Sequence, residues 1–295
     1  MGGAPSAPLA ASQAGNKQGQ PMTVREDEAR PGLNCRPVSK LSAWWARGST
    51  LSALSIAVFL GIWQLVTSTG LIEPIFLASP LAIAKVAYEQ FFVTGDIYPH
   101  ILVSLTEAFI GFALAIVFGI LLGLAMGRFE RVRQLLEPFV MALYSTPSVA
   151  LLPLFILWLG IGLWSKVLIV FLGGVFAILV NTIAGVRGTN QRLIETARAF
   201  TASETEVFLY IILPAAMPFI VAGIRLAIGR VLISVFVAEL YASNQGVGFL
   251  ITQAGTTYNT PLMLMGILLF TIAGMALSQG LSFIEERYLS RFREQ

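Results

Sequence analysis

Ionisable residues lie within or near long apolar stretches of this sequence, where each charge needs a partner or a function. Glu107 lies near one end of such a stretch, and Arg225, Arg230 and Glu239 lie on another. A charge in hydrocarbon costs about 2.5–3.5 kcal/mol on insertion scales. We therefore expect both arginines to face protein or a water-filled path, and Arg225, Arg230 and Glu239 are candidates to line a translocation path. Attraction of an anion and a structural pair with a carbonyl or carboxylate are both open interpretations of these two residues.

A short polar run interrupts another apolar stretch. Tyr144, Ser145 and Thr146 precede Pro147, and Pro153 follows soon after. Proline removes a backbone donor and bends or breaks a helix. We predict that the three polar residues line a translocation path, and the alternative is a kinked helix that contacts no solute.

Motifs for catalysis are missing from the sequence. It has no Gly-x-x-x-x-Gly-Lys-Ser/Thr loop, so we expect no ATP bound by this chain. His100 is the only histidine and Cys35 the only cysteine, which leaves no metal site, triad or intrachain disulfide to propose. We therefore predict no catalytic residue, no metal and no cofactor on this chain, which should not be an enzyme.

The composition is that of a membrane protein that contacts the lipid bilayer. Hydrophobic residues make up 56% of the chain and charged residues only 12%, about half the fraction usual in soluble proteins. No alternation typical of a β-barrel is visible, so the sequence predicts an all-α bundle. Six segments have about the length that spans a bilayer: Leu51–Thr69, Ser104–Gly127, Leu135–Leu159, Trp164–Val186, Pro214–Tyr241 and Pro261–Phe283.

Small residues recur at every fourth position of the second predicted span. Such a stripe lets another helix approach closely, either within the chain or across a dimer contact. We favour ordinary packing within the chain. The stripe consists of Gly111, Ala115, Gly119, Gly123 and Gly127.

Lysine and arginine residues predict the orientation of the spans. They cluster in the N-terminal tail, after the second and fourth spans and in the C-terminal tail. Lys85 and Lys166 are exceptions in the opposite loops. We predict a transmembrane domain at residues 49–290, both termini in the cytoplasm, and a disordered cytoplasmic tail at residues 1–48. The pI of about 9.2 then reflects orientation and not nucleic-acid binding.

A polar island at residues 187–213 separates two apolar spans and is predicted to form two short helices. Asn190 is placed to cap the first helix. Ser203 and Glu206 have the spacing of a capping box for the second. Pro214 suits the first turn of the next span. A compact loop of this kind on a membrane bundle is suited to contacting a partner outside the membrane.

This loop resembles the cytoplasmic coupling loop of the permease subunits of ABC importers. The family pattern is Glu-Ala-Ala, three residues, Gly, nine residues, Ile, one residue and Leu-Pro. Thr201 replaces the glycine, which ends a helix in a left-handed conformation that a β-branched residue resists. The positions at the family spacing are Glu195, Thr196, Ala197, Thr201, Ile211, Leu213 and Pro214.

Further segments resemble the nitrate, sulfonate, taurine and bicarbonate branch of these permeases. They are Leu77-Ala78-Ser79-Pro80, residues 153–162, Val237-Ala238-Glu239 and residues 246–250. The resemblance implies a six-helix permease of the type I importer kind, in the bacterial inner membrane, and a homodimer. It also implies two cytoplasmic ATPase subunits that bind ATP and Mg²⁺ and dock on residues 191–210, an extracytoplasmic solute-binding protein, and a small solute such as an anion.

Two alternatives stay open. An ion-coupled secondary transporter is the other function considered, although no inverted repeat is evident and acidic residues in the spans are few. For Glu195, the alternative to a docking role is a local ion pair, because Arg192 and Arg198 each lie three residues away on the same helical side.

Overall fold

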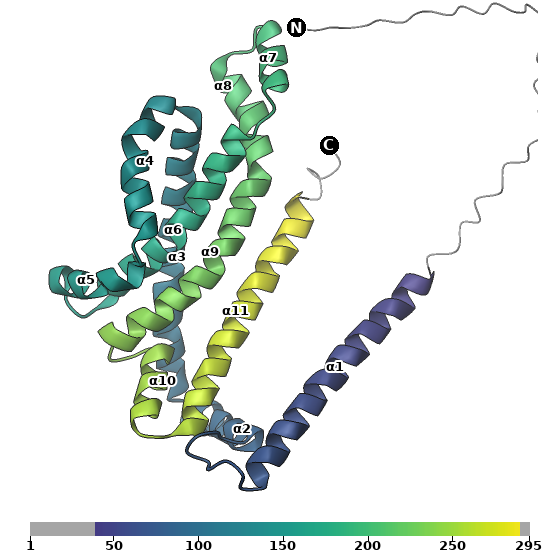
Figure 1. Cartoon of the computed structure of the whole chain (residues 1–295), viewed down its shortest axis with the longest axis vertical. Coiled ribbons are helices and arrows are strands. Elements are labelled where there is room, and N and C mark those ends of the chain that lie inside the picture. The colour runs from purple at the N-terminus through teal and green to yellow at the C-terminus, as the bar shows by residue number, and fades with distance from the viewer. Residues whose placement is uncertain (1–38, 290–295) are drawn as a thin grey trace, which may run out of the picture. The chain divides into compact units, whose positions relative to one another are not determined.

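The computed structural model describes the backbone of residues 39–289 and the side chains of residues 51–283. Within that range the regular elements are helices (Figure 1). They are α1 (Ser39–Ser68), α2 (Pro80–Tyr88), the π-helix η1 (Glu89–Val93), α3 (Ile97–Arg128), α4 (Glu130–Ser145), the 3₁₀-helix η2 (Ser148–Leu151), α5 (Leu152–Leu159), α6 (Leu163–Arg187), α7 (Gln191–Ala199), α8 (Glu204–Val207), the π-helix η3 (Phe208–Ile212), α9 (Leu213–Ala242), α10 (Val247–Thr256) and α11 (Thr260–Leu289).

The expectation of an all-helical membrane protein is confirmed. Five helical segments in the described range are long and apolar enough to cross a bilayer, and a sixth span results if α4 and the following η2–α5 count as one. That pair is bent by 92°. The chain groups into two compact units, residues 1–54 and 55–295, and the description that follows concerns the second.

The predicted third span is therefore a broken one. Thr146 is extended, with ψ 126°, because the ring of the following Pro147 excludes the helical conformation. A short 3₁₀ turn then leads into α5, whose first turn contains Pro153. The polar run predicted to interrupt the apolar stretch lies at this break.

Helix α6 lies between α3 and α9 (Figure 1). The small-residue stripe of α3 faces α6, so it serves packing within the chain. A Cβ added to Gly123 would lie 2.6 Å from the Cβ of Thr182 on α6, closer than side chains pack. On α9, a Cβ added to Gly223 would lie 3.1 Å from the carbonyl oxygen of Ala177. Small residues thus bring three backbones close together at both faces of α6.

The loop before α9 differs from expectation in one respect. The second short helix does not end before Pro214, because α8, η3 and α9 form one continuous helical segment, Glu204–Ala242. The amide of Leu213 donates to the carbonyl of Phe208, five residues back. This widened turn lies directly before Pro214, which has no amide to donate and whose ring would clash in a regular turn. The π turn therefore lets the helix continue through the proline.

The predicted tail at residues 1–48 lies largely outside the described residues. Its last part, residues 39–48, belongs to α1, so helical structure begins earlier than predicted. This segment is rich in residues with good helix propensity and continues directly into the apolar run that starts at Leu51. The C-terminal residues 290–295 also lie outside the described range.

Candidate functional site

Local hydrogen bonds set where the two short helices of the polar loop begin. The side chain of Asn190 accepts a hydrogen bond from the amide of Arg192 at 3.0 Å and caps α7, as predicted. Ser203 and Glu206 form the predicted capping box at the start of α8. Each cap satisfies amides that the first turn of a helix leaves without a partner.

Thr201 adopts the left-handed conformation that the family glycine would supply, with φ 61°. The amide of Ala202 donates to the carbonyl of Ala197 at 3.0 Å, and the amide of Thr201 donates to that of Arg198 at 2.9 Å. These two bonds define a Schellman motif. The chain therefore keeps the turn although threonine resists it, at a cost of about 1–2 kcal/mol.

The residues at the family spacing divide into two groups. Glu195 and Thr196 lie on the exposed side of α7. Ala197, Ile211 and Leu213 pack instead against an apolar cluster that holds the loop on the ends of α6 and α9. The buried members of that cluster are Val186, Ile194, Val207, Ile212, Ala216 and Ile220. One group thus fixes the loop, and the other faces away from the bundle.

Large apolar side chains of the same loop are also exposed. Phe200 is 82% exposed, Tyr210 76% and Leu193 56%. Exposed aromatic side chains on a rigid loop are typical of protein–protein contact sites. This surface, which we call the docking face, comprises Leu193, Glu195, Phe200 and Tyr210.

Ion pairs connect the loop to neighbouring helices. Glu204 at the start of α8 pairs with Arg128 at the end of α3 and with Arg198 of α7, the latter at 2.8 Å. The local pair considered for Glu195 does not form, because Arg198 turns to Glu204. No ion pair of Glu195 occurs among the described residues, so its carboxylate is available to a partner.

The broken third span, α6 and α9 line an open pocket of about 270 Å³. The guanidinium carbon of Arg230 lies 5.6 Å from the centre of the Tyr144 ring, a cation–π contact. Ser145 and Thr146 also line the pocket. The structure thus brings together four residues predicted to line a path. Arg225 does not line this pocket, and Glu239 lies elsewhere.

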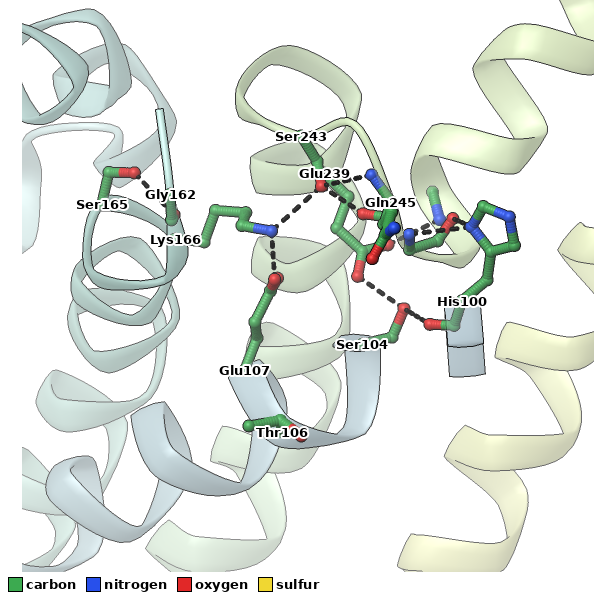
Figure 2. A network of polar contacts seen from close by, with 12 residues as sticks. His100, Ser104, Thr106, Glu107, Gly162, Ser165, Lys166, Glu239, Ser243 and Gln245 are labelled. Carbon is green, nitrogen blue, oxygen red and sulfur yellow. Dashed lines mark hydrogen bonds and ion pairs between the residues drawn. The ribbon is translucent and has the colours of Figure 1, made fainter. Parts of the chain in front are cut away.

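A separate polar network crosses the bundle near the start of α3 (Figure 2). Glu107 of α3 forms an ion pair with Lys166 of α6, and both side chains are almost completely buried. The ammonium group of Lys166 also donates to the hydroxyl of Ser243 at 3.0 Å. This pair explains why Lys166 is an exception to the charge pattern of the loops: it neutralises Glu107 inside the bundle.

Glu239 belongs to the same region and is fully buried. Its carboxylate accepts hydrogen bonds from the amide of Gly248 at 2.6 Å and from the hydroxyl of Ser104 at 2.5 Å. The amide of Val247 donates to Ser104 at 2.9 Å, and that of Gly246 to His100 at 3.0 Å. Side chains from α3 and α9 therefore satisfy the free amides at the start of α10 (Figure 2).

Sequence reasoning missed this network and α10 itself. A signal was present for the ion pair, since Glu107 and Lys166 are single opposite charges near the ends of two apolar spans. Their pairing across α3 and α6 depends on how the two helices are aligned in the bundle. In the described part of the chain, no cluster of histidine, cysteine, aspartate and glutamate is suited to hold a metal ion.

Comparisons with known proteins agree on one family of transport proteins. A family profile described as "Binding-protein-dependent transport system inner membrane component" matches residues 115–293. The taurine transport system permease protein TauC of Escherichia coli (strain K12) is 34% identical over 246 residues, which cover 82% of this chain and 90% of that protein. The putative aliphatic sulfonates transport permease protein SsuC of Bacillus subtilis (strain 168) is 33% identical over 245 residues, covering 83% and 87%.

A solved structure shares the fold. It is described as the crystal structure of an amino acid ABC transporter with histidines. Its TM-score is 0.52 at 18% sequence identity, with 70% of this chain and 97% of that chain covered. The fold is therefore that of a type I ABC importer permease.

The left-handed turn predicts the effect of Thr201→Gly. Glycine adopts this conformation without strain, so the variant should be more stable than wild type by about 1 kcal/mol. Thr196→Gly, inside α7, is the matched control and should lose a few tenths of a kcal/mol, because glycine is a still poorer helix former than threonine. Denaturant unfolding of the purified protein in detergent measures both. A loss of stability in Thr201→Gly would contradict a left-handed turn.

The buried ion pair predicts the effect of Lys166→Met. This variant leaves Glu107 buried without its partner and should lower the free energy of unfolding by about 3–5 kcal/mol. Adding Glu107→Leu should restore most of that loss, because no buried charge is left. Lys85→Met, at an exposed lysine, should change little. Thermal unfolding in detergent is the measurement. A double variant as unstable as Lys166→Met alone would contradict the explanation that the unpaired charge of Glu107 destabilises the protein.

Proposed function

Because the chain belongs to the binding-protein-dependent transport system inner membrane component family, the permease subunits of ABC importers, we propose that it forms the path for a small anion in an ATP-driven importer. ATP and Mg²⁺ bind to separate ATPase subunits, which dock on residues 191–210 of this chain. The observation that carries the proposal is the docking face, an exposed acidic and aromatic surface on a loop fixed by packing and ion pairs.

The anionic solute is supported by the relatives and by the pocket. Two of the most similar relatives are described as transporting taurine and aliphatic sulfonates. Sulfonates carry a permanent negative charge near neutral pH. Arg230 supplies a positive charge to the pocket at the break between α4 and α5. A sulfonate or a related small anion is therefore the solute class that we propose.

The continuous helix from the loop into the bundle supports a mechanism of coupling. Movement of the ATPase subunits displaces the docking face and with it α8. Since α8 runs through η3 into α9 without a break, α9 moves as part of the same segment. α9 packs against α6 and lines the pocket, so the displacement changes the access to the path. This is rigid-body alternation between inward- and outward-facing states.

The proposed orientation follows from the charge pattern. Arg128, Arg187 and Arg198 lie at the end of the bundle that carries the docking face, which we place in the cytoplasm together with both termini. The start of α3 and the α10–α11 turn then face outward, toward a solute-binding protein. Two copies of this chain form the permease.

An ion-coupled secondary transporter is the second candidate. Such a transporter uses titrating acidic groups within its spans. In the spans that the structure describes, Glu107 and Glu239 are both buried and engaged by Lys166, Ser104 and Gly248. This arrangement favours a structural role for both carboxylates and so favours the ATP-driven importer.

Reversing the charge of Glu195 tests the docking face. Glu195→Arg should insert and fold normally, because the side chain is exposed and has no ion pair in the described structure. It should lose association with the ATPase chain, because a charge buried at an interface without its partner costs about 2–5 kcal/mol. Co-purification of the ATPase chain and ATP hydrolysis in reconstituted membranes are the measurements.

The matched control is Glu89→Arg, the same charge reversal at an exposed glutamate of η1, far along the chain from the docking face. It should leave both quantities at wild-type values. Phe200→Ala is a second variant, and it should weaken association by removing an exposed aromatic contact. Wild-type association in both Glu195→Arg and Phe200→Ala would exclude this face as the docking site.

A further inference from the structure

Arg230 and Lys166 both lie in spans, but Arg230 is exposed in this chain whereas Lys166 is buried. Lys166 lies in a span and is neutralised by Glu107. No carboxylate lies within 4.0 Å of the Arg230 side chain among the residues whose side chains are described. Its described contact is the face of the Tyr144 ring. Because a cation near the middle of a span is costly in contact with hydrocarbon, we expect the exposed Arg230 to face a water-filled path and not lipid.

The surroundings of Arg230 are suited to an oxyanion. Tyr144, Ser145, Ser148 and Ser234 line the same pocket and carry hydroxyl groups. The planar guanidinium group of arginine presents pairs of N–H donors that match the oxygen atoms of carboxylates, phosphates and similar groups. Hydroxyl donors can bond the remaining oxygen atoms of such a group.

The size of the pocket limits the solute. Its volume of about 270 Å³ lies just below the range of about 300–1,000 Å³ typical of sites for drug-sized ligands. A small solute fits such a space, which is open to one side. Apolar side chains complete the lining, including Leu172, Phe176 and Ile233, and they suit a short aliphatic chain attached to the charged group.

We propose that Arg230 binds the anionic group of the solute during translocation, with Tyr144 and the hydroxyl groups at the α4–α5 break completing a site for a small sulfonate or similar oxyanion. The inference rests on the proposed importer function and adds a solute-selecting site within the permease itself. The bound anion supplies the counter-charge that Arg230 lacks. Because α9 carries Arg230 and is continuous with α8, displacement of the coupling loop moves the guanidinium group relative to the break and releases the anion.

Uptake by the assembled importer tests the site. The permease, its ATPase chain and its solute-binding protein are reconstituted in vesicles, and ATP-driven uptake of radiolabelled taurine is measured. Arg230→Gln should lower uptake by about tenfold or more, the loss expected for hydrogen bonds to a charged group. Arg230→Lys keeps the charge but not the paired donors and should give an intermediate rate. Lys85→Gln removes an exposed charge outside the pocket and should transport like wild type.

Two further measurements distinguish a role of Arg230 in binding the anion from a role in folding or assembly. Co-purification of the ATPase chain and solute-free ATP hydrolysis should stay within about twofold of wild type in Arg230→Gln, since neither depends on the anion. Methanesulfonate should raise the melting temperature of the detergent-solubilised wild-type permease above that in sodium chloride of equal ionic strength, and should not do so for Arg230→Gln.

Wild-type uptake by Arg230→Gln would overturn the inference. Equal uptake of taurine and of a solute that lacks an anionic group by the wild type would also overturn it. The inference would also be overturned if Arg230→Gln lost assembly and uptake to the same extent and methanesulfonate did not stabilise the wild type. Arg230 would then have a structural role only. Failure of the wild-type permease to bind any ATPase chain would instead overturn the proposed function, and the co-purification assay shows this separately.

Discussion

Polar groups inside a bilayer must find partners within the protein, because hydrocarbon offers none. This constraint accounts for the positions of the polar residues in this chain. Glu107 and Lys166 neutralise each other between α3 and α6. His100, Ser104 and Glu239 satisfy the amides at the start of α10. The carbonyls and amides released at the α4–α5 break lie beside the pocket, where irregular backbone is tolerated because it lines a cavity. Arg230 on α9 contacts the face of the Tyr144 ring at this pocket.

Close packing of three helices connects these polar sites to the loop. Glycine residues bring α3 and α9 against α6, so that a displacement of one helix is transmitted to the others. The loop is held by an apolar cluster and by Glu204, which pairs with residues of α3 and α7. It continues into α9 through a π turn and Pro214. A partner that moves the docking face therefore acts on the helix that carries Arg230, which makes a chain without an ATP site suitable for ATP-driven transport.

The features that depend on local sequence could be predicted. Apolar length predicted the spans, Asn190 and Ser203 predicted the caps, and Pro147 predicted the break. Features that depend on the three-dimensional alignment of helices could not. The pairing of Glu107 with Lys166 is of this kind, as is the short helix α10, whose amides are capped from other elements. Continuity through Pro214 was missed because a proline normally marks a helix start, and the π turn before it is not visible in the sequence. A local pair of Glu195 with Arg192 or Arg198 was left open by the sequence, and Arg198 pairs with Glu204 instead.

The central claim is that ATP hydrolysis by a partner drives transport through this chain. The direct measurement is solute uptake into vesicles that contain the permease, with ATP supplied to the ATPase chain in one set and a proton or sodium gradient imposed without ATP in the other. We expect uptake only with ATP, and no uptake with ATP when the ATPase chain is omitted. Uptake that follows the ion gradient in the absence of ATP and of the ATPase chain would contradict the account and identify an ion-coupled transporter.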